Sequence, residues 1–444
     1  MFLNLNPLLI TFYYENFFLS LLFFLCVQLV MARKVVVTST SDNESSPTSG
    51  MLRYLVDNAQ LNDTITFNVS TVNLVAQIDV ASSIVIDGGT GMVTIDGGAN
   101  DRIFNVTSYS STTKIVIKNL KLINGKEVSD YGWGGAMYVF ATSGSVNVDN
   151  CIFSNNEAVA TDDGQGGALR NQGGTFTNCS FFNNKVSGSA GPQGGGAVQA
   201  IGGLFINCVF SNNQAKWGGG VYASNNAQFF NCTFTNNKAT STSSAGGIQS
   251  EEAEFVNCIS YNNSVNGSES NINAISNSVI KNCAMESSNS FVGTNGNIGL
   301  SSSPFKGGNG ADSLTLIDGP CVNAGTTTGI TVLSIDILGN IRITGSAIDL
   351  GAYEFNSTPL STSVFTSVYK NTVVLYPNPS KGTVYFNNGI LQTNNIEVEV
   401  YDLTGKLILT QSQTNSPLTI AEPGLYQVKV KSNNSVYYQK IIIE

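Results

Sequence analysis

The stretch that decides the fold is a heptapeptide that occurs five times: NCIFSNN at 150–156, NCSFFNN at 178–184, NCVFSNN at 207–213, NCTFTNN at 231–237 and NCISYNN at 257–263. A sixth Asn-Cys pair at 282–283 continues the series, and successive cysteines are 28, 29, 24, 26 and 25 residues apart. A second motif precedes the first five pairs: GGAM at 134, GGAL at 166, GGAV at 195, GGGV at 218 and AGGI at 245. A period near 25 residues holds about three short strands with their turns and is too short for two-helix repeats of about 33 residues or more. The repeat therefore predicts a right-handed parallel β-helix, a solenoid in which each period forms one coil.

The cysteine and the phenylalanine within each heptapeptide are expected inside the coil. They are two residues apart, so they lie on the same face of a strand. Coils stack at the strand spacing of about 4.8 Å, which aligns equal positions in columns. Buried cysteine behaves as a small hydrophobe, and neither a CxxC pair nor a spacing suited to one site is present, so a metal or redox array is the less favoured interpretation. The expected phenylalanine column is Phe153, Phe181, Phe210 and Phe234.

The paired asparagines that follow are expected at a turn of every coil. Asparagine tolerates the left-handed backbone conformation, and its amide can bond to the equivalent amide of the next coil. The pairs are Asn155-Asn156, Asn183-Asn184, Asn212-Asn213, Asn236-Asn237 and Asn262-Asn263.

Composition excludes several classes of function. The chain has 444 residues, of which 42% are hydrophobic and 11% charged, which favours a packed core over disorder. It contains no histidine, which excludes Ser-His-Asp and Cys-His catalysis and histidine-ligated metals. The net charge of −9 argues against nucleic acid as a partner, because nucleic-acid binding needs clustered lysine and arginine. We therefore predict neither a cofactor nor a metal.

Two segments near the N-terminus are expected to differ from the coils: a signal peptide and a capping helix. Residues 17–32 are apolar but shorter than the roughly 20 residues of a spanning helix. Segment 1–32 is interpreted as a signal peptide, with no stable transmembrane segment after its cleavage. Solenoid ends expose unpaired edges, and 49–60 places Leu52, Leu55, Val56 and Ala59 on one helical face, which predicts a short N-terminal capping helix.

Two resemblances extend this prediction over residues 33–355. The pairing of GGA-apolar with FxxN at 134–263 resembles the repeat of polymorphic outer membrane proteins, which are β-helical surface adhesins. Residues 303–355, with SPF, GPCVNAG, DILGNIR and AIDLGAYEF, resemble the terminal module of secreted β-helix proteins. We call the exported β-helix the passenger. It is expected over 33–355, with regular repeats at about 134–290 and the terminal module at about 303–355.

The C-terminal part is expected to be a separate domain. Residues 356–371 are rich in Ser and Thr and are interpreted as a linker. Residues 372–444 alternate apolar and polar positions between turns, which predicts a small β-sandwich. This segment resembles the C-terminal sorting domain of the type IX secretion system. Such a domain implies that the secretion machinery is a partner, and that the protein passes through the periplasm and is then secreted or attached to the outer surface. The motif residues are Pro377, Asn378, Pro379, Gly405, Lys406 and Gly424.

Three functions remain open for the passenger. The favoured one is a non-catalytic adhesin or glycan-binding rod whose partner is a polysaccharide or a host or biofilm surface. Trp133 and Trp217 each precede a Gly pair, three coils apart, and are its candidate ligand-binding residues. The second is a polysaccharide lyase or glycoside hydrolase, for which Asp162 and Asp163 are the candidate catalytic residues, although no catalytic cluster is evident. The third is a purely structural surface rod.

Overall fold

The computed structural model describes residues 32–142, 144–188, 193–307, 313–358, 375–376, 380–386, 396–402, 406–412, 417–432 and 435–443. The chain forms two compact units, Met1–Pro359 and Leu360–Glu444. The predicted signal peptide, apart from Ala32, lies outside the described residues, as do 359–371 of the predicted linker.

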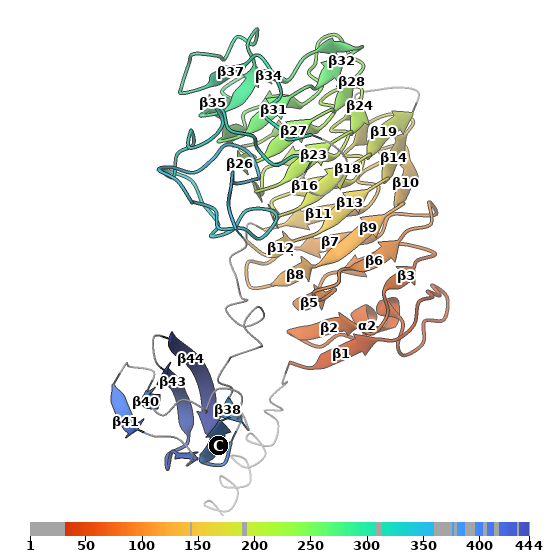
Figure 1. Cartoon of the computed structure of the whole chain (residues 1–444). Helices are drawn as coiled ribbons and strands as arrows, with labels where there is room; N and C mark the ends of the chain where they lie inside the picture. The colour runs from red at the N-terminus through yellow and green to blue at the C-terminus, as the bar shows by residue number, and fades with distance from the viewer. Residues whose placement is uncertain are drawn as a thin grey trace, which may run out of the picture. The chain divides into compact units, whose positions relative to one another are not determined.

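The first unit is a parallel β-helix whose coils cross up to four sheets in the same order (Figure 1). The first coils have no strand in sheet 3, and an additional two-stranded sheet is present. Sheet 1 contains β1 (Lys34–Val37), β2 (Asp63–Phe67), β5 (Ile84–Asp87), β8 (Ile115–Lys118), β12 (Val146–Asp149), β17 (Thr175–Thr177), β22 (Leu204–Ile206), β26 (Gln228–Phe230), β30 (Glu254–Val256) and β35 (Val279–Lys281). Sheet 2 contains β3 (Thr71–Asn73), β6 (Val93–Asp96), β9 (Leu120–Ile123), β13 (Ile152–Ser154), β18 (Ser180–Phe182), β23 (Val209–Ser211), β27 (Thr233–Thr235), β31 (Ile259–Tyr261), β36 (Ala284–Glu286) and β37 (Ile298–Leu300). Sheet 3 contains β10 (Lys126–Ser129), β14 (Glu157–Ala160), β19 (Lys185–Gly188), β24 (Gln214–Ala215), β28 (Lys238–Ala239), β32 (Ser264–Val265) and β33 (Ser268–Glu269). Sheet 4 contains β4 (Ile78–Val80), β7 (Phe104–Ser108), β11 (Met137–Ala141), β16 (Leu169–Gln172), β21 (Val198–Ile201), β25 (Val221–Ser224), β29 (Ile248–Glu251) and β34 (Ile272–Ile275).

Equal positions of successive coils stand one above another. Phe153 pairs with Phe181, Phe181 with Phe210, and Phe210 with Phe234 in sheet 2. Strands within the four sheets pair in parallel, except for the antiparallel end pair β32–β33. The predicted parallel β-helix and its register are therefore confirmed.

Two phenylalanine columns fill the interior where the repeats are most regular. The predicted column in sheet 2 stacks with ring centroids 4.6, 5.0 and 4.7 Å apart. A second column, which we did not predict, comes from sheet 1 and meets the first nearly edge-on; its members are Phe176, Phe205, Phe229 and Phe255. All these rings are fully buried, and burial of each stabilises the fold by about 1.5–3 kcal/mol.

The six repeat cysteines form a third interior column. Cys151, Cys179, Cys208, Cys232, Cys258 and Cys283 are each 0% exposed. They are free thiols, and each Sγ lies near a backbone carbonyl of the preceding coil, as for Cys151 and Ile117 O at 3.8 Å. Burial raises the pKa of the Cys151 thiol to about 12, which keeps it protonated. The cysteines therefore act as core residues.

The two asparagines of each pair have different roles: the first forms a turn, and the second forms a ladder of hydrogen bonds between coils. The first member of each pair has a positive φ of 55–59°, as for Asn212 (59°). The second member is buried: the backbone N–H and Nδ2 of Asn213 both donate to Oδ1 of Asn237, at 3.0 and 2.9 Å, and Nδ2 also donates to the Phe181 carbonyl at 3.0 Å. The same contacts recur from Asn156 to Asn263. This ladder joins each coil to the next.

At the N-terminal end, helix α2 (Leu52–Asp57) lies within the predicted helical segment. Leu52 and Val56 are buried, and the Arg53 guanidinium bonds to Asp42 at 2.5 Å and to two backbone carbonyls, those of Ala76 and Gln77. That this helix caps the stack stays a prediction.

Residues 301–358 do not add further strands to the four sheets; among their described residues they return along the outer face of sheet 2. Asn207 Nδ2 donates to the Ile335 carbonyl at 2.8 Å, and Asn257 Nδ2 to that of Thr326 at 2.8 Å. The backbone N–H of Ala352 donates to Thr233 Oγ1 at 3.0 Å. This terminal module thus covers outward side chains of sheet 2.

Four charged side chains are buried within the terminal module. Asp336, Arg342 and Asp349 are each 1% exposed, and Glu354 is 4% exposed. Arg342 Nη1 lies 3.8 Å from Glu354 Oε2, and the Glu354 backbone N–H donates to Asp336 Oδ2 at 3.1 Å. Burial, and then the charge of Asp349, raise the pKa of Glu354 to about 7.

The second unit contains two antiparallel sheets. One has the order β38 (Leu375–Tyr376), β39 (Thr383–Phe386), β42 (Leu418–Thr419), and the other β41 (Leu407–Ser412), β40 (Ile396–Tyr401), β43 (Gly424–Ser432), β44 (Ser435–Ile443). Side chains of both sheets, such as Val384 and Val400, share one buried core. Within the described residues of the chain, no helix is long and apolar enough to cross a membrane.

Two motif residues of this unit lie within the described residues. At the hairpin between β40 and β41, the Asp402 backbone N–H donates to the Lys406 carbonyl, and the Lys406 backbone N–H donates to Asp402 Oδ1, both at 3.0 Å. Gly424 begins β43. Pro377, Asn378, Pro379 and Gly405 lie outside the described residues.

Because the six repeat thiols are fully buried, they should react only when the fold opens. We expect a small thiol reagent to leave them unmodified in the native protein and to modify all six in denaturant, as counted by mass spectrometry. Rapid modification of most of them without denaturant would contradict their place in the core.

Asn213→Ala should be destabilising by about 2–5 kcal/mol, because it leaves the buried amide and N–H groups of Asn184 without their acceptor. The measurement is the shift in the denaturation midpoint. Asn212→Gly is the matched control. Because glycine accepts a φ of 59°, the free energy of unfolding should change by less than about 1 kcal/mol. Equal effects of the two changes would exclude a special role for the buried ladder.

Glu354 should make stability fall as pH rises. Its pKa is raised to about 7 in the folded chain, against about 4.3 unfolded, so between these values the folded state binds more protons. Stability is therefore lost as pH rises from about 4.3 through 7. Over this range we expect the melting temperature of the native protein to fall relative to that of Glu354→Gln. A difference between the two melting temperatures that does not change with pH would contradict the raised pKa of Glu354.

Candidate functional site

The outer side of sheet 4 carries a column of polar and aromatic side chains. Inward residues alternate with outward ones along each strand, and parallel pairing aligns the outward residues of neighbouring strands. The first outward column is Tyr138, Arg170, Gln199, Tyr222 and Gln249. A second outward column beside it is Phe140, Gln172, Ile201, Ser224 and Glu251.

The two tryptophans form one line over this sheet. Trp133 bridges to Gln165, Gln165 pairs with Gly194, and Gly194 bridges to Trp217. The short strands β15 (Gly164–Gln165) and β20 (Gln193–Gly194) lie in this line. Three coil steps separate the tryptophans, which corresponds to about 14 Å along the axis. Both side chains are half-buried, and both indole N–H groups are buried without a hydrogen-bond partner among the described residues.

Trp133 belongs to a stack with an arginine at its centre. The Arg170 guanidinium carbon lies 4.0 Å from the centroid of the Trp133 ring and 5.4 Å from that of Tyr138. The rings of Tyr131 and Tyr138 both lie 5.8 Å from Trp133. Such cation–π contacts orient the ring and the guanidinium toward each other. Trp133 is therefore held in place, rather than projecting as an isolated ring.

The guanidinium of Arg170 donates hydrogen bonds to two side-chain amides. Its Nε donates to Gln165 Oε1 at 2.7 Å, and its Nη1 donates to Gln172 Oε1 at 2.8 Å. Tyr138 donates its hydroxyl proton to the same Gln172 oxygen at 3.1 Å. Burial lowers the pKa of Arg170, which is 7% exposed.

Asp162 and Asp163 lie in the loop between β14 and β15. Asp162 is exposed and Asp163 half-buried, and the backbone N–H of each donates to the Asp130 carbonyl. Asp163 Oδ2 accepts a hydrogen bond from Gln165 Nε2 at 2.6 Å. Burial raises the pKa of Asp163, against the lowering effect of Gln165 and Arg170. Gln165 thus separates the carboxylate of Asp163 from the guanidinium of Arg170.

Glu251 is a further carboxylate of sheet 4, at the other end of the tryptophan line. It accepts the hydroxyl hydrogen bond of Tyr222, and this contact raises the pKa of Tyr222 after the larger effect of burial. Glu251 lies three coils beyond the coil of Asp163, at about 14 Å. Carboxylates that hydrolyse a glycosidic bond lie about 5–9.5 Å apart, so these two do not form such a pair.

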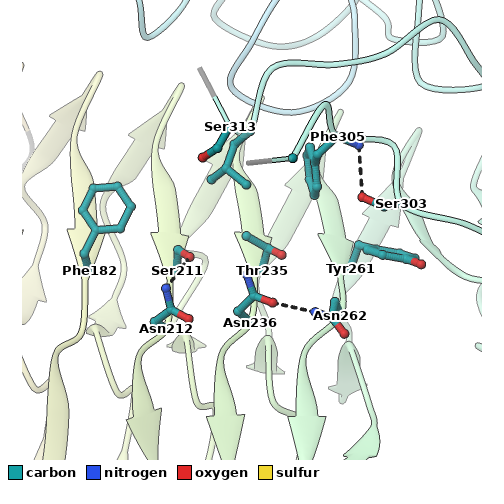
Figure 2. Close-up of a pocket in the computed structure, with 12 residues that line it drawn as sticks. Phe182, Ser211, Asn212, Thr235, Asn236, Tyr261, Asn262, Ser303, Phe305 and Ser313 are labelled. Carbon is teal, nitrogen blue, oxygen red and sulfur yellow. Dashed lines mark hydrogen bonds between the residues drawn. The ribbon is translucent and has the colours of Figure 1, made fainter. Parts of the chain in front are cut away.

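A groove of about 380 Å³ lies on a different surface, between the outer face of sheet 2 and the terminal module (Figure 2). Its floor is formed by residues of three successive coils: Ser211-Asn212, Thr235-Asn236 and Tyr261-Asn262. Phe182, Phe305 and Leu314 also line it. Asn262 Nδ2 donates to Asn236 Oδ1 at 2.5 Å, which links two coils of the floor. The lining residues carry no formal charge.

The sequence led us to predict the two tryptophans as ligand-binding residues, and this stays a prediction; it did not single out Arg170, Tyr138 or the groove as parts of a site. A signal for the first two was present: the residue directly after each glycine motif is polar or aromatic, as in GGAM-Tyr138 and GGAL-Arg170. The groove had no signal of this kind, because it is formed by residues far apart in the chain.

Comparisons with known proteins agree with the two-part architecture. Residues 374–444 match the model of the secretion system C-terminal sorting domain. Residues 207–224 match the model of the Chlamydia polymorphic membrane protein repeat. A search of curated proteins found no match. Among solved structures, the chain is similar to jun a 1, the major allergen from cedar pollen, with 19% identity over 63% of this chain and 82% of that chain and a TM-score of 0.31.

These findings define the class of protein. The chain combines a parallel β-helix, one segment of which matches the polymorphic membrane protein repeat, with a type IX sorting domain. It is exported by the type IX secretion system to the cell surface or the extracellular space.

Proposed function

We propose that the passenger is a non-catalytic adhesin that binds polysaccharide chains along the tryptophan line of sheet 4. The observation that carries this proposal is the stack of Trp133, Arg170 and Tyr138 beside a column of glutamine and serine side chains. Binding sites of this kind combine aromatic surface with a few polar groups that fix orientation. Sugar rings offer apolar faces to the aromatic side chains and hydroxyl groups to the amides.

The geometry of the rod suits an extended polymer. Trp133 and Trp217 lie on one line parallel to the coil axis, about 14 Å apart. A polysaccharide lying along this line meets outward side chains of each coil, with an indole at each end and polar groups between them. Several shallow contacts on one rigid rod, and many rods on one surface, add up to strong attachment although each contact is weak.

Asp163 favours the enzymatic alternative in one respect. Its pKa is raised by burial, as expected of a general acid, and it lies beside the arginine stack. A hydrolase also needs a second carboxylate within about 9.5 Å across the scissile bond. Glu251 is about 14 Å away along the coil axis and bonded to Tyr222, and Asp162 adjoins Asp163 on the same loop. Asp130 lies on the neighbouring loop, and its carboxylate accepts a hydrogen bond from Thr161 at 2.7 Å. Binding is therefore the better supported function.

The test uses the purified protein with plant, algal and microbial polysaccharides immobilised as separate matrices. We expect retention on at least one polymer and no new chain ends, with Trp133→Ala or Trp217→Ala weakening retention about tenfold. Phe182→Ala is the matched control, because it truncates a half-exposed ring on sheet 2 instead of sheet 4.

Three other outcomes contradict the proposal. Turnover that Asp163→Asn or Asp162→Asn abolishes would identify an enzyme. Retention that Phe182→Ala abolishes, and that neither tryptophan change affects, would move binding to the groove of sheet 2. Failure to retain any polymer would favour a structural rod.

A further inference from the structure

Arg170 is a buried cation without an anionic partner. It is 7% exposed, and its nitrogens Nε and Nη1 bond to the neutral amides of Gln165 and Gln172. Within the described residues, no carboxylate lies within ion-pair distance of it, and Asp163 acts on it only through space. Among the described residues, Nη2 makes no hydrogen bond beside these contacts of Nε and Nη1.

The other partly or fully buried arginines of the passenger are arranged differently. Arg53 forms an ion pair with Asp42 at 2.5 Å, and Arg102 forms one with Glu127 at 3.0 Å. Arg342 lies among three carboxylates of the terminal module. Burial lowers the pKa of Arg170, and a buried charge without an ion pair costs free energy. An anion from outside the chain would remove that cost.

We propose that Arg170 selects acidic polysaccharides, by binding the carboxylate of a uronic acid whose ring lies against the Trp133–Tyr138 stack. This inference rests on the proposed function and names its ligand class. Gln165 and Gln172 hold the guanidinium by Nε and Nη1, which leaves Nη2 to donate to a carboxylate oxygen. Charge-assisted hydrogen bonds of arginine to carboxylates are about twice as strong as neutral ones. The amide of Gln165 keeps Asp163 from taking this place.

The ligand-side experiment needs no change to the protein. Alginate, a polymer of uronic acids, is compared with alginate whose carboxyl groups have been reduced to neutral alcohols. We expect the native protein to bind the reduced polymer about tenfold more weakly, and raised salt to weaken binding of alginate but not of the reduced form. In a Trp217→Phe variant, Trp133 is the only tryptophan, so a saturable change in its emission with alginate reports binding at this stack.

The protein-side experiment removes the charge. Arg170→Gln should reduce alginate binding to the level of the reduced polymer, and Arg170→Lys, which keeps the charge but not the fork geometry, should restore part of it. Lys185→Gln is the charge-matched control, because Lys185 lies on sheet 3 in an ion pair with Glu157 at 3.1 Å. Circular dichroism and the melting temperature establish that each variant is folded.

The outcomes separate the two proposals. Equal retention of alginate and its reduced form by the native protein would overturn the role of Arg170 and leave polysaccharide binding intact. If Lys185→Gln weakens alginate binding as much as Arg170→Gln does, the preference for alginate arises from net charge alone. This result would also overturn the role of Arg170. If neither these polymers nor any of the wider panel is retained, both proposals fail.

Discussion

Hydrogen bonding between successive coils is the constraint on which the rest of this structure depends. Each buried asparagine joins the next through its backbone N–H and its side-chain amide, as Asn184 does with Asn213 at 2.9 and 3.0 Å. Because both groups of one residue meet one oxygen, a coil cannot slip by a residue without leaving buried polar groups unpaired. The ladder thereby sets the register in which phenylalanines and cysteines form continuous columns.

The same register organises the outside of the molecule. Outward residues of sheet 4 form columns for the same reason as inward ones, although their identities differ from coil to coil: Tyr138, Arg170, Gln199 and Tyr222 occupy equivalent positions. The core can therefore keep its repeat while the surface acquires a particular chemistry. Arg170 contacts Trp133 and Tyr138 only because coil stacking aligns it with residues that are 37 and 32 positions earlier in the chain.

The terminal module shows a different use of the fold. It covers outward residues of sheet 2, including Val209, Thr233 and Ile259, which would otherwise face solvent. The module buries a charged quartet around Arg342, which ties its own turns together through backbone carbonyls of Asp349 and Gly351. Sheets 2 and 4 therefore present different surfaces: a neutral groove roofed by the module, and a line of aromatic and polar residues.

The sequence by itself determined the parallel β-helix, the inward Phe and Cys columns, the turn asparagines and the sorting domain. The first three features depend on local rules, because side chains alternate every two residues along a strand and a coil repeats about every 25 residues. The sorting domain is indicated by the resemblance of its motifs to a known family. It did not reveal the second Phe column, although Phe176, Phe205, Phe229 and Phe255 all lie three residues before a cysteine. A left-handed asparagine stands between each of these phenylalanines and its cysteine, so the two-residue alternation of one strand does not extend across it. Only the tertiary structure decided that Arg170 is buried without a carboxylate, that Trp133 is stacked upon it, and that the terminal module closes a groove on sheet 2. These properties depend on which side chains meet across coils and across distant segments, and on how much water is excluded there, which no spacing within a single repeat specifies.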